Sequence, residues 1–163
     1  MKYFAYGSNM SLVRLRERVP SAERIGTFFL KEHQLRFHKV SKDGSGKCDA
    51  FKTNNTGDVV IGALFEINEN EKKALDIAEG LGYGYDEMIV NVQNNSGETF
   101  EVLTYYAIKM DSSLKPYYWY LNHVVIGANE TNVPVQYLDV IQSTECIKDP
   151  DKNRDAKQRA MYS

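Results

Sequence analysis

Short runs of apolar positions, some alternating with polar ones, recur along the chain, and each is typical of a β-strand. Clusters of Gly, Asn, Asp and Ser, as at Ser41–Gly46 and Asn54–Asp58, separate several runs and are typical of turns. In the first run, alternation places Tyr3 and Tyr6 on opposite faces. The predicted strands are Lys2–Tyr6, Ile25–Leu30, His33–Val40, Lys47–Lys52, Val59–Ile67, Glu87–Gln93 and Glu98–Ile108.

Four other segments have the apolar spacing of helices. The first, Met10–Val19, has Asn9 or Ser11 as a candidate N-cap and Pro20 at its end. The others are Asn68–Glu79, Pro116–Ile126 and Val133–Ile141. Because the helices interrupt the strands without alternating regularly with them, the pattern favours the α+β class. We expect a small mixed or antiparallel β-barrel flanked by helices.

The length of 163 residues is typical of one domain, which we expect over residues 1–147. Residues 148–163 carry five basic and three acidic side chains among few apolar ones. This composition predicts a polar C-terminal tail, either a surface helix or a frayed end.

Composition and charge narrow the possible partners. Twenty basic and 22 acidic residues give a net charge of −2, without the basic excess of a nucleic-acid-binding protein. No apolar stretch approaches the roughly 20 residues of a membrane helix, and Gly7 and Asn9 interrupt the N-terminal segment before a secretory apolar region. The two cysteines, Cys48 and Cys146, predict neither a disulfide framework nor a zinc site. We therefore expect a cytoplasmic protein with no nucleic-acid or membrane partner.

The turn Tyr6-Gly7-Ser8-Asn9 joins a predicted strand to a predicted helix. The first amides of a helix lack partners within the helix and lie at its positive end, so a carboxylate or phosphate can bind there. Glycine allows such a ligand to approach the backbone closely. The alternative is an ordinary capped turn without a ligand.

Glu79 lies at the end of the second predicted helix, one turn after Leu75 on its apolar face. Asn68 and Glu71 form a possible capping box at the start of this helix, and Gly80 marks its stop. Partial burial and the negative end of the helix would both raise the pKa of the Glu79 carboxyl, as general acid–base catalysis requires. Alternatively, the side chain bends into water.

Other candidate residues fail on geometry. An odd spacing puts His33 and His38 on opposite faces of one strand, so they cannot both bind one metal, and we expect no metal site. Arg14, Arg16 and Arg18 spread around the first helix and are typical of a solvated face.

Taken together, three motifs resemble the γ-glutamylcyclotransferase-like family. The sequence FAYGSNM at residues 4–10 is similar to the family's opening YGSN motif. The sequence LDIAEG at residues 75–80 is similar to its LDxxEG segment, with Tyr85 shortly after. Tyr120, followed by a Gly-Ala pair and a proline, is similar to its late tyrosine-then-helix segment. The resemblance spans most of residues 3–142.

This resemblance implies a small mixed barrel and an enzyme that needs no metal or organic cofactor. Such enzymes convert a γ-glutamyl amide into 5-oxoproline and a free amine. The resemblance implies that Glu79 is the catalytic acid–base group. The residues it implies for binding the small-molecule γ-glutamyl substrate are Tyr6, Gly7, Ser8, Asn9, Tyr85 and Tyr120.

The sequence leaves the leaving amine open between an amino acid, a lysine side chain, a polyamine and a biosynthetic intermediate. Asp86 and Glu87 follow Tyr85 where the family often has a basic residue, which predicts discrimination against an acidic leaving group. Two alternatives keep the fold: a non-catalytic γ-glutamyl-binding or interaction module, and a γ-glutamyl amide hydrolase. The Tyr117–Tyr120 run is a candidate contact surface for a homodimer if it is exposed.

Overall fold

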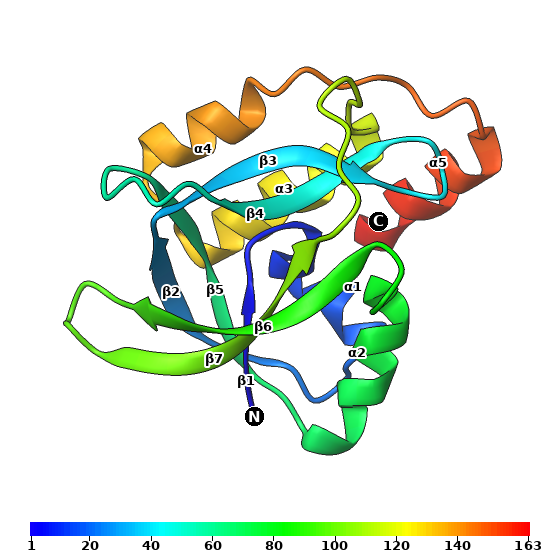
Figure 1. Ribbon diagram of the computed structural model, residues 1–163. Helices are drawn as coiled ribbons and strands as arrows, with labels where there is room; N and C mark the ends of the chain where they lie inside the picture. Colours follow the sequence, from blue (N-terminus) through cyan, green and yellow to red (C-terminus); the bar gives the residue numbers. More distant parts are fainter.

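Five strands close into a barrel in the computed structural model, which describes all residues of the chain, 1–163 (Figure 1). They are β1 (Lys2–Ala5), β2 (Glu23–Lys31), β5 (Val59–Glu66), β6 (Tyr85–Gln93) and β7 (Thr99–Ala107). Their order around the barrel is β1-β5-β2-β6-β7. Because β1 is antiparallel to β5 and parallel to β7, the sheet is mixed. This confirms the expected α+β class with a small barrel.

The other two strands, β3 (His33–Val40) and β4 (Gly46–Lys52), form a separate hairpin. Asp49 fastens this hairpin to the barrel, because its Oδ1 accepts the amide hydrogen of Ala107 at 2.8 Å. Its Oδ2 lies 2.7 Å from Nε2 of the buried His38. The hairpin thereby places Cys48, which lies next to Asp49, near the end of β1.

Helices pack around the barrel and the hairpin (Figure 1). The α-helices are α1 (Leu12–Arg16), α2 (Lys72–Glu79), α3 (Tyr118–Thr131), α4 (Val135–Gln142) and α5 (Lys152–Arg159). Three short 3-10 helices are η1 (Ser8–Met10), η2 (Glu69–Glu71) and η3 (Ala160–Tyr162).

The single helix expected over Met10–Val19 is divided in two. Ser11 has extended backbone angles, φ −69° and ψ 114°, so it ends η1 and begins α1. The turn at Ser11 packs closely against Gly127 of α3: a Cβ added to Gly127 would lie 2.4 Å from the Ser11 nitrogen. This close packing fixes the position of the residues that follow β1.

The start of α2 also differs from the expected capping box. Asn68 does accept a hydrogen bond from the Asn70 amide, as a cap. Glu71, however, turns away from it and accepts hydrogen bonds from the backbone amide and the hydroxyl of Ser21. Gly80 ends the helix in the left-handed conformation, φ 69°, as its position predicts.

The polar C-terminal segment forms α5 and η3, and some of its side chains reach into the domain. The buried Asp149 receives two hydrogen bonds from Arg154, both 2.6 Å, and one from Trp119 in α3. These charge-assisted bonds hold the pKa of the Asp149 carboxyl at about 2. At the other end, the Tyr162 hydroxyl lies 2.8 Å from the Ser11 hydroxyl.

The Tyr117–Tyr120 run is mostly internal, which contradicts its expected use as a dimer surface. Tyr117, Trp119 and Tyr120 are buried, and only Tyr118 is exposed. Separately, no helix of the structure has both the length and the apolar character needed to cross a bilayer.

Candidate active site

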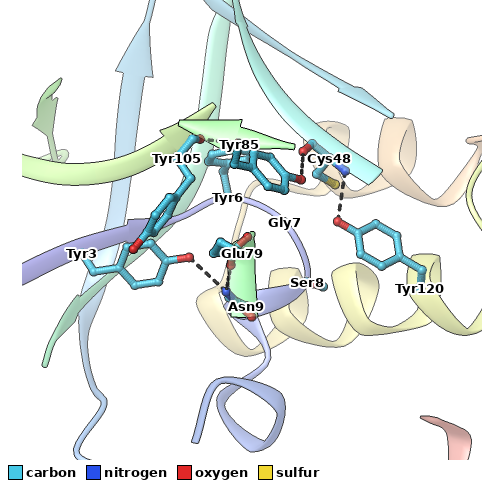
Figure 2. A pocket seen from close by; sticks show the side chains of 10 residues that line it. All are labelled: Tyr3, Tyr6, Gly7, Ser8, Asn9, Cys48, Glu79, Tyr85, Tyr105 and Tyr120. Atoms are coloured by element: carbon cyan, nitrogen blue, oxygen red, sulfur yellow. Dashed lines mark hydrogen bonds between the residues drawn. The ribbon is translucent and has the colours of Figure 1, made fainter. Parts of the chain in front are cut away.

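A small cavity opens where β1 ends, between α2, α3 and the start of β4 (Figure 2). All the residues proposed from the sequence line it, although they come from four separate segments of the chain. The lining residues are Tyr3, Tyr6, Gly7, Ser8, Asn9, Cys48, Glu79, Tyr85, Tyr105 and Tyr120. The structure therefore brings the turn after β1 and the end of α2 together.

Three lining residues were missed by sequence reasoning: Tyr3, Cys48 and Tyr105. Strand alternation placed Tyr3 and Tyr6 on opposite faces, but β1 ends at Ala5, so Tyr6 no longer follows the alternation and both side chains reach the cavity. Cys48 and Tyr105 arrive through tertiary packing, and no local pattern in the sequence marks them.

Gly7 lies where the backbone passes closest to the hairpin. An added Cβ would lie 2.8 Å from Cys48 Cβ and 3.5 Å from the Tyr120 hydroxyl oxygen. The amide hydrogen of Gly7 has no hydrogen-bond partner in the structure, whereas Met10 and Ser11 donate back to Gly7 and Ser8 as the first turn forms. The cavity wall at this point is thus bare backbone with a free donor.

Glu79 directs its carboxylate into the cavity (Figure 2), where Oε1 accepts a hydrogen bond from Asn9 Nδ2 at 2.5 Å. The same amide group donates to the Tyr3 hydroxyl at 3.1 Å. Burial raises the pKa of the Glu79 carboxyl, and the nearby Arg18 and Arg14 together with the Asn9 hydrogen bond partly oppose that rise. The carboxylate is therefore held in place and shifted toward protonation.

The hydroxyl groups of Tyr6, Tyr85 and Tyr120 differ in whether their hydrogen is donated to a backbone carbonyl. Tyr6 donates to the carbonyl oxygen of Tyr105 at 2.6 Å, and Tyr85 donates to the carbonyl oxygen of Cys48 at 2.5 Å. Tyr120 instead accepts a hydrogen bond from the Cys48 amide at 3.0 Å. Because a phenol has a single hydrogen to donate, the Tyr6 and Tyr85 hydroxyls are committed to the backbone, while the Tyr120 hydroxyl has only the weakly accepting Cys48 thiol beside it.

Arg14 contradicts the expectation of a solvated arginine face. Its side chain is buried, with Nε donating to the Ser8 hydroxyl at 3.1 Å and Nη1 donating to Gln158 Oε1 at 2.9 Å. Desolvation lowers its pKa to about 10, so it stays charged at neutral pH. Arg18 donates from Nη1 to Asn9 Oδ1 at 3.0 Å. Arg14 and Arg18 thus both donate hydrogen bonds to the turn after β1, and Arg14 also donates one to Gln158 of α5.

Asp86 and Glu87 do not reach the cavity, which contradicts the expectation that they repel an acidic leaving group. Both side chains are exposed, and Glu87 forms an ion pair with Lys72 at 2.7 Å. No group of three or more His, Cys, Asp or Glu side chains is arranged to hold a metal ion.

Several known proteins are similar to this chain over most of its length. The model of the AIG2-like family matches residues 59–141. The γ-glutamylcyclotransferase of Bos taurus is 30% identical over 148 residues, covering 88% of this chain and 78% of that protein. The γ-glutamylcyclotransferase of Homo sapiens is 29% identical with the same coverage.

Solved structures share the whole fold. A γ-glutamyl cyclotransferase matches with a TM-score of 0.86 at 24% identity, covering 98% of both chains. An uncharacterized human protein matches with a TM-score of 0.88 at 26% identity, covering 99% of this chain and 98% of its own. The chain therefore belongs to the AIG2-like family and is an enzyme of the γ-glutamylcyclotransferase type.

Proposed function

We propose that the protein cleaves a γ-glutamyl amide by cyclising the glutamyl part, which gives 5-oxoproline and a free amine. The observation that carries this proposal is the shared cavity, in which the Glu79 carboxylate lies hydrogen-bonded to Asn9 of the turn after β1. The nucleophile and the carbonyl belong to one substrate molecule, so the protein has mainly to fold the substrate and move protons.

The turn from Tyr6 to Asn9 binds the α-carboxylate of the glutamyl part. Support comes from the unpaired Gly7 amide, the absence of a side chain there, and the charge of Arg14 behind Ser8. A carboxylate anchored at this point leaves the α-amino group inside the cavity, within the space that Glu79 shares.

Glu79 acts as the acid–base group. It takes a proton from the α-ammonium group, whose nitrogen then attacks the γ-carbonyl carbon. As the ring closes and the amide C–N bond breaks, Glu79 returns the proton to the departing nitrogen. The raised pKa suits both halves of this exchange, since the group must accept a proton and release it near neutral pH.

The Tyr120 hydroxyl, with free amides of the turn, stabilises the oxyanion that forms on the γ-carbonyl oxygen. Its support is the hydroxyl hydrogen left available by the Cys48 amide contact. Tyr6 and Tyr85 shape the cavity wall, because their hydroxyl hydrogens are already bound to backbone carbonyls.

One assay tests the proposal. The purified protein is incubated with γ-glutamyl dipeptides and γ-glutamyl amines, and 5-oxoproline is separated from glutamate by chromatography. We expect 5-oxoproline in equal amount to the released amine. Glutamate instead would indicate a hydrolase that uses water as the nucleophile, and release of neither product would indicate a binding module.

Replacing Gly7 with alanine is expected to lower both stability and activity. The new Cβ would overlap Cys48, so β4 must shift, at a cost of about 1–3 kcal/mol in the free energy of unfolding. That shift would also move the backbone that positions Tyr120, and we expect kcat/KM to fall by about tenfold or more. Urea unfolding and steady-state kinetics measure the two effects.

A second substitution supplies the control. Cys48→Gly removes the Cβ and Sγ that the new methyl group would meet, so the double variant Gly7→Ala/Cys48→Gly should regain kcat/KM relative to Gly7→Ala alone. If the losses in kcat/KM of the two single variants simply added in the double variant, the contact with Cys48 would not be the reason for glycine at this position.

A further inference from the structure

A second hollow adjoins the cavity at Glu79. The two share five lining residues: Ser8, Asn9, Glu79, Tyr85 and Tyr120. What distinguishes the second hollow is its charge, because four basic side chains line it and Glu79 is its one acidic residue. The basic residues are Arg14, Arg18, Lys39 and Lys47.

Three of these four basic side chains lack the carboxylate partner that a partly buried cation normally has. Arg14, Arg18 and Lys39 form no ion pair in the structure, and only Lys47 has one, with Asp43 at 3.0 Å. Arg14 is buried, and Lys39 lies over the Tyr85 ring with Nζ 4.6 Å from the ring centre. Partly buried charges are ordinarily paired, so the hollow is left with an excess of positive charge.

The charges also act on one another. Burial, together with the smaller effects of the Arg14 and Lys39 charges, lowers the pKa of the Lys47 ammonium to about 8 against the opposing effect of Asp43. Like charges that approach this closely cost free energy, which an anion bound among them would offset. The arrangement is suited to a ligand with negative charge.

The position of the hollow relative to the reaction identifies that ligand, on the basis of the proposed function. The glutamyl part occupies the first cavity, and Glu79 delivers a proton to the leaving nitrogen. The rest of the leaving group must then extend beyond the first cavity near Glu79, and the second hollow adjoins the first cavity at Glu79.

We propose that this hollow is the leaving-group subsite and that it selects amines carrying carboxylates, with acidic amino acids preferred over neutral ones. The substrate class is then a γ-glutamyl dipeptide with an acidic second residue. The reaction balances as before: the α-nitrogen forms the new C–N bond, the peptide C–N bond breaks, and the acidic amino acid leaves with the proton from Glu79. Neutral amines gain nothing from the four cations, and polyamines are repelled by them.

A matched pair of substrates tests this selectivity. γ-Glutamyl-glutamate and γ-glutamyl-glutamine have the same shape and differ by one negative charge. We expect the wild type to favour the acidic dipeptide by about tenfold in kcat/KM at low ionic strength, and to turn over γ-glutamyl-putrescine least of the three. Equal rates for the two dipeptides, or a preference for the neutral one, would overturn the proposal.

Lys39→Gln is the informative variant, because Lys39 forms no ion pair whose loss would disturb the fold. We expect it to reduce the preference for the acidic dipeptide to about threefold or less, while Lys39→Glu reverses it. The matched control is Lys73→Gln, which removes a charge from an exposed position of α2 outside both hollows and should leave the ratio unchanged. If Lys39→Gln slowed both dipeptides by the same factor, the cations would be binding the glutamyl α-carboxylate instead.

Binding separates failure of the subsite from failure of the proposed reaction. With the Glu79→Gln variant, which keeps dipeptides intact, calorimetry should show tighter binding of γ-glutamyl-glutamate than of γ-glutamyl-glutamine, and Lys39→Gln added to this variant should remove the difference. If no substrate yields 5-oxoproline but this difference in affinity persists, the reaction is refuted and the anionic subsite stands. Equal affinities refute the subsite even when 5-oxoproline is released.

Discussion

Replacing Glu79 with glutamine is expected to lower kcat for 5-oxoproline release by about a thousandfold, the largest effect of any single substitution in this protein. Glutamine keeps the size of the side chain, and its carbonyl oxygen can still accept the hydrogen bond from Asn9. What it loses is the ability to take a proton from the α-ammonium group and return it to the leaving nitrogen. Rapid-quench or steady-state assays of 5-oxoproline measure the loss.

The stability of this variant provides its own control. Because burial raises the pKa of Glu79, its ionised form is disfavoured in the folded state. The stabilisation that protonated Glu79 contributes is therefore complete at low pH and is lost as the pH rises through the raised pKa. Glutamine does not titrate, so the Tm of the variant should rise relative to wild type as the pH increases from the ordinary glutamate pKa, about 4.3, through the raised pKa of the folded protein.

An exposed glutamate gives the matched comparison. Glu69→Gln removes a charge from an exposed position of η2 that does not line the cavity, and should change neither kcat nor the pH dependence of Tm. Near wild-type kcat in Glu79→Gln, with the folded state intact, would contradict the acid–base role. A Tm difference that shrank with rising pH would contradict the raised pKa.

The barrel and its helices follow largely from local patterns. Apolar runs separated by turn residues located every strand to within a few residues, and Gly80 marked the end of α2 at the position where the structure has a left-handed residue. Helix boundaries were less accurate. The helix expected at Pro116–Ile126 extends over Tyr118–Thr131 and ends at Asn132, which adopts the left-handed conformation of a C-cap, φ 59°.

The site depended on information that local patterns do not contain. Asn9 and Glu79 lie 70 residues apart and touch only after the barrel closes, so only the resemblance to a family linked them beforehand. Arg14 was placed in solvent because helical spacing cannot show that α5 covers its side of the helix. Glu87 was placed near the site because it follows Tyr85 closely, yet it pairs with Lys72 outside the cavity.

Tyr120→Phe is expected to have the second largest effect, a fall in kcat of about a hundredfold with a smaller change in KM. The reason is the hydroxyl hydrogen, which is donated to no backbone carbonyl and has only the weakly accepting Cys48 thiol beside it, so it can turn to the oxyanion as the ring closes. The substitution also leaves the Cys48 amide without its acceptor, so some loss of stability accompanies it, of about 1–3 kcal/mol. Kinetics and urea unfolding must therefore be measured together.

Tyr85→Phe separates the two consequences, because it removes a hydrogen bond to the backbone of the same residue, Cys48. The Tyr85 hydroxyl donates to the Cys48 carbonyl oxygen, so its removal leaves a buried backbone group unpaired just as Tyr120→Phe does. No available donor is lost, however, and kcat should fall by less than about tenfold. If the two variants lost kcat equally, the Tyr120 effect would be a matter of holding Cys48 in place. If Tyr120→Phe raised KM but left kcat unchanged, we would conclude that the Tyr120 hydroxyl of the wild type binds the ground-state substrate. The amides of the turn would then be the only groups that stabilise the oxyanion.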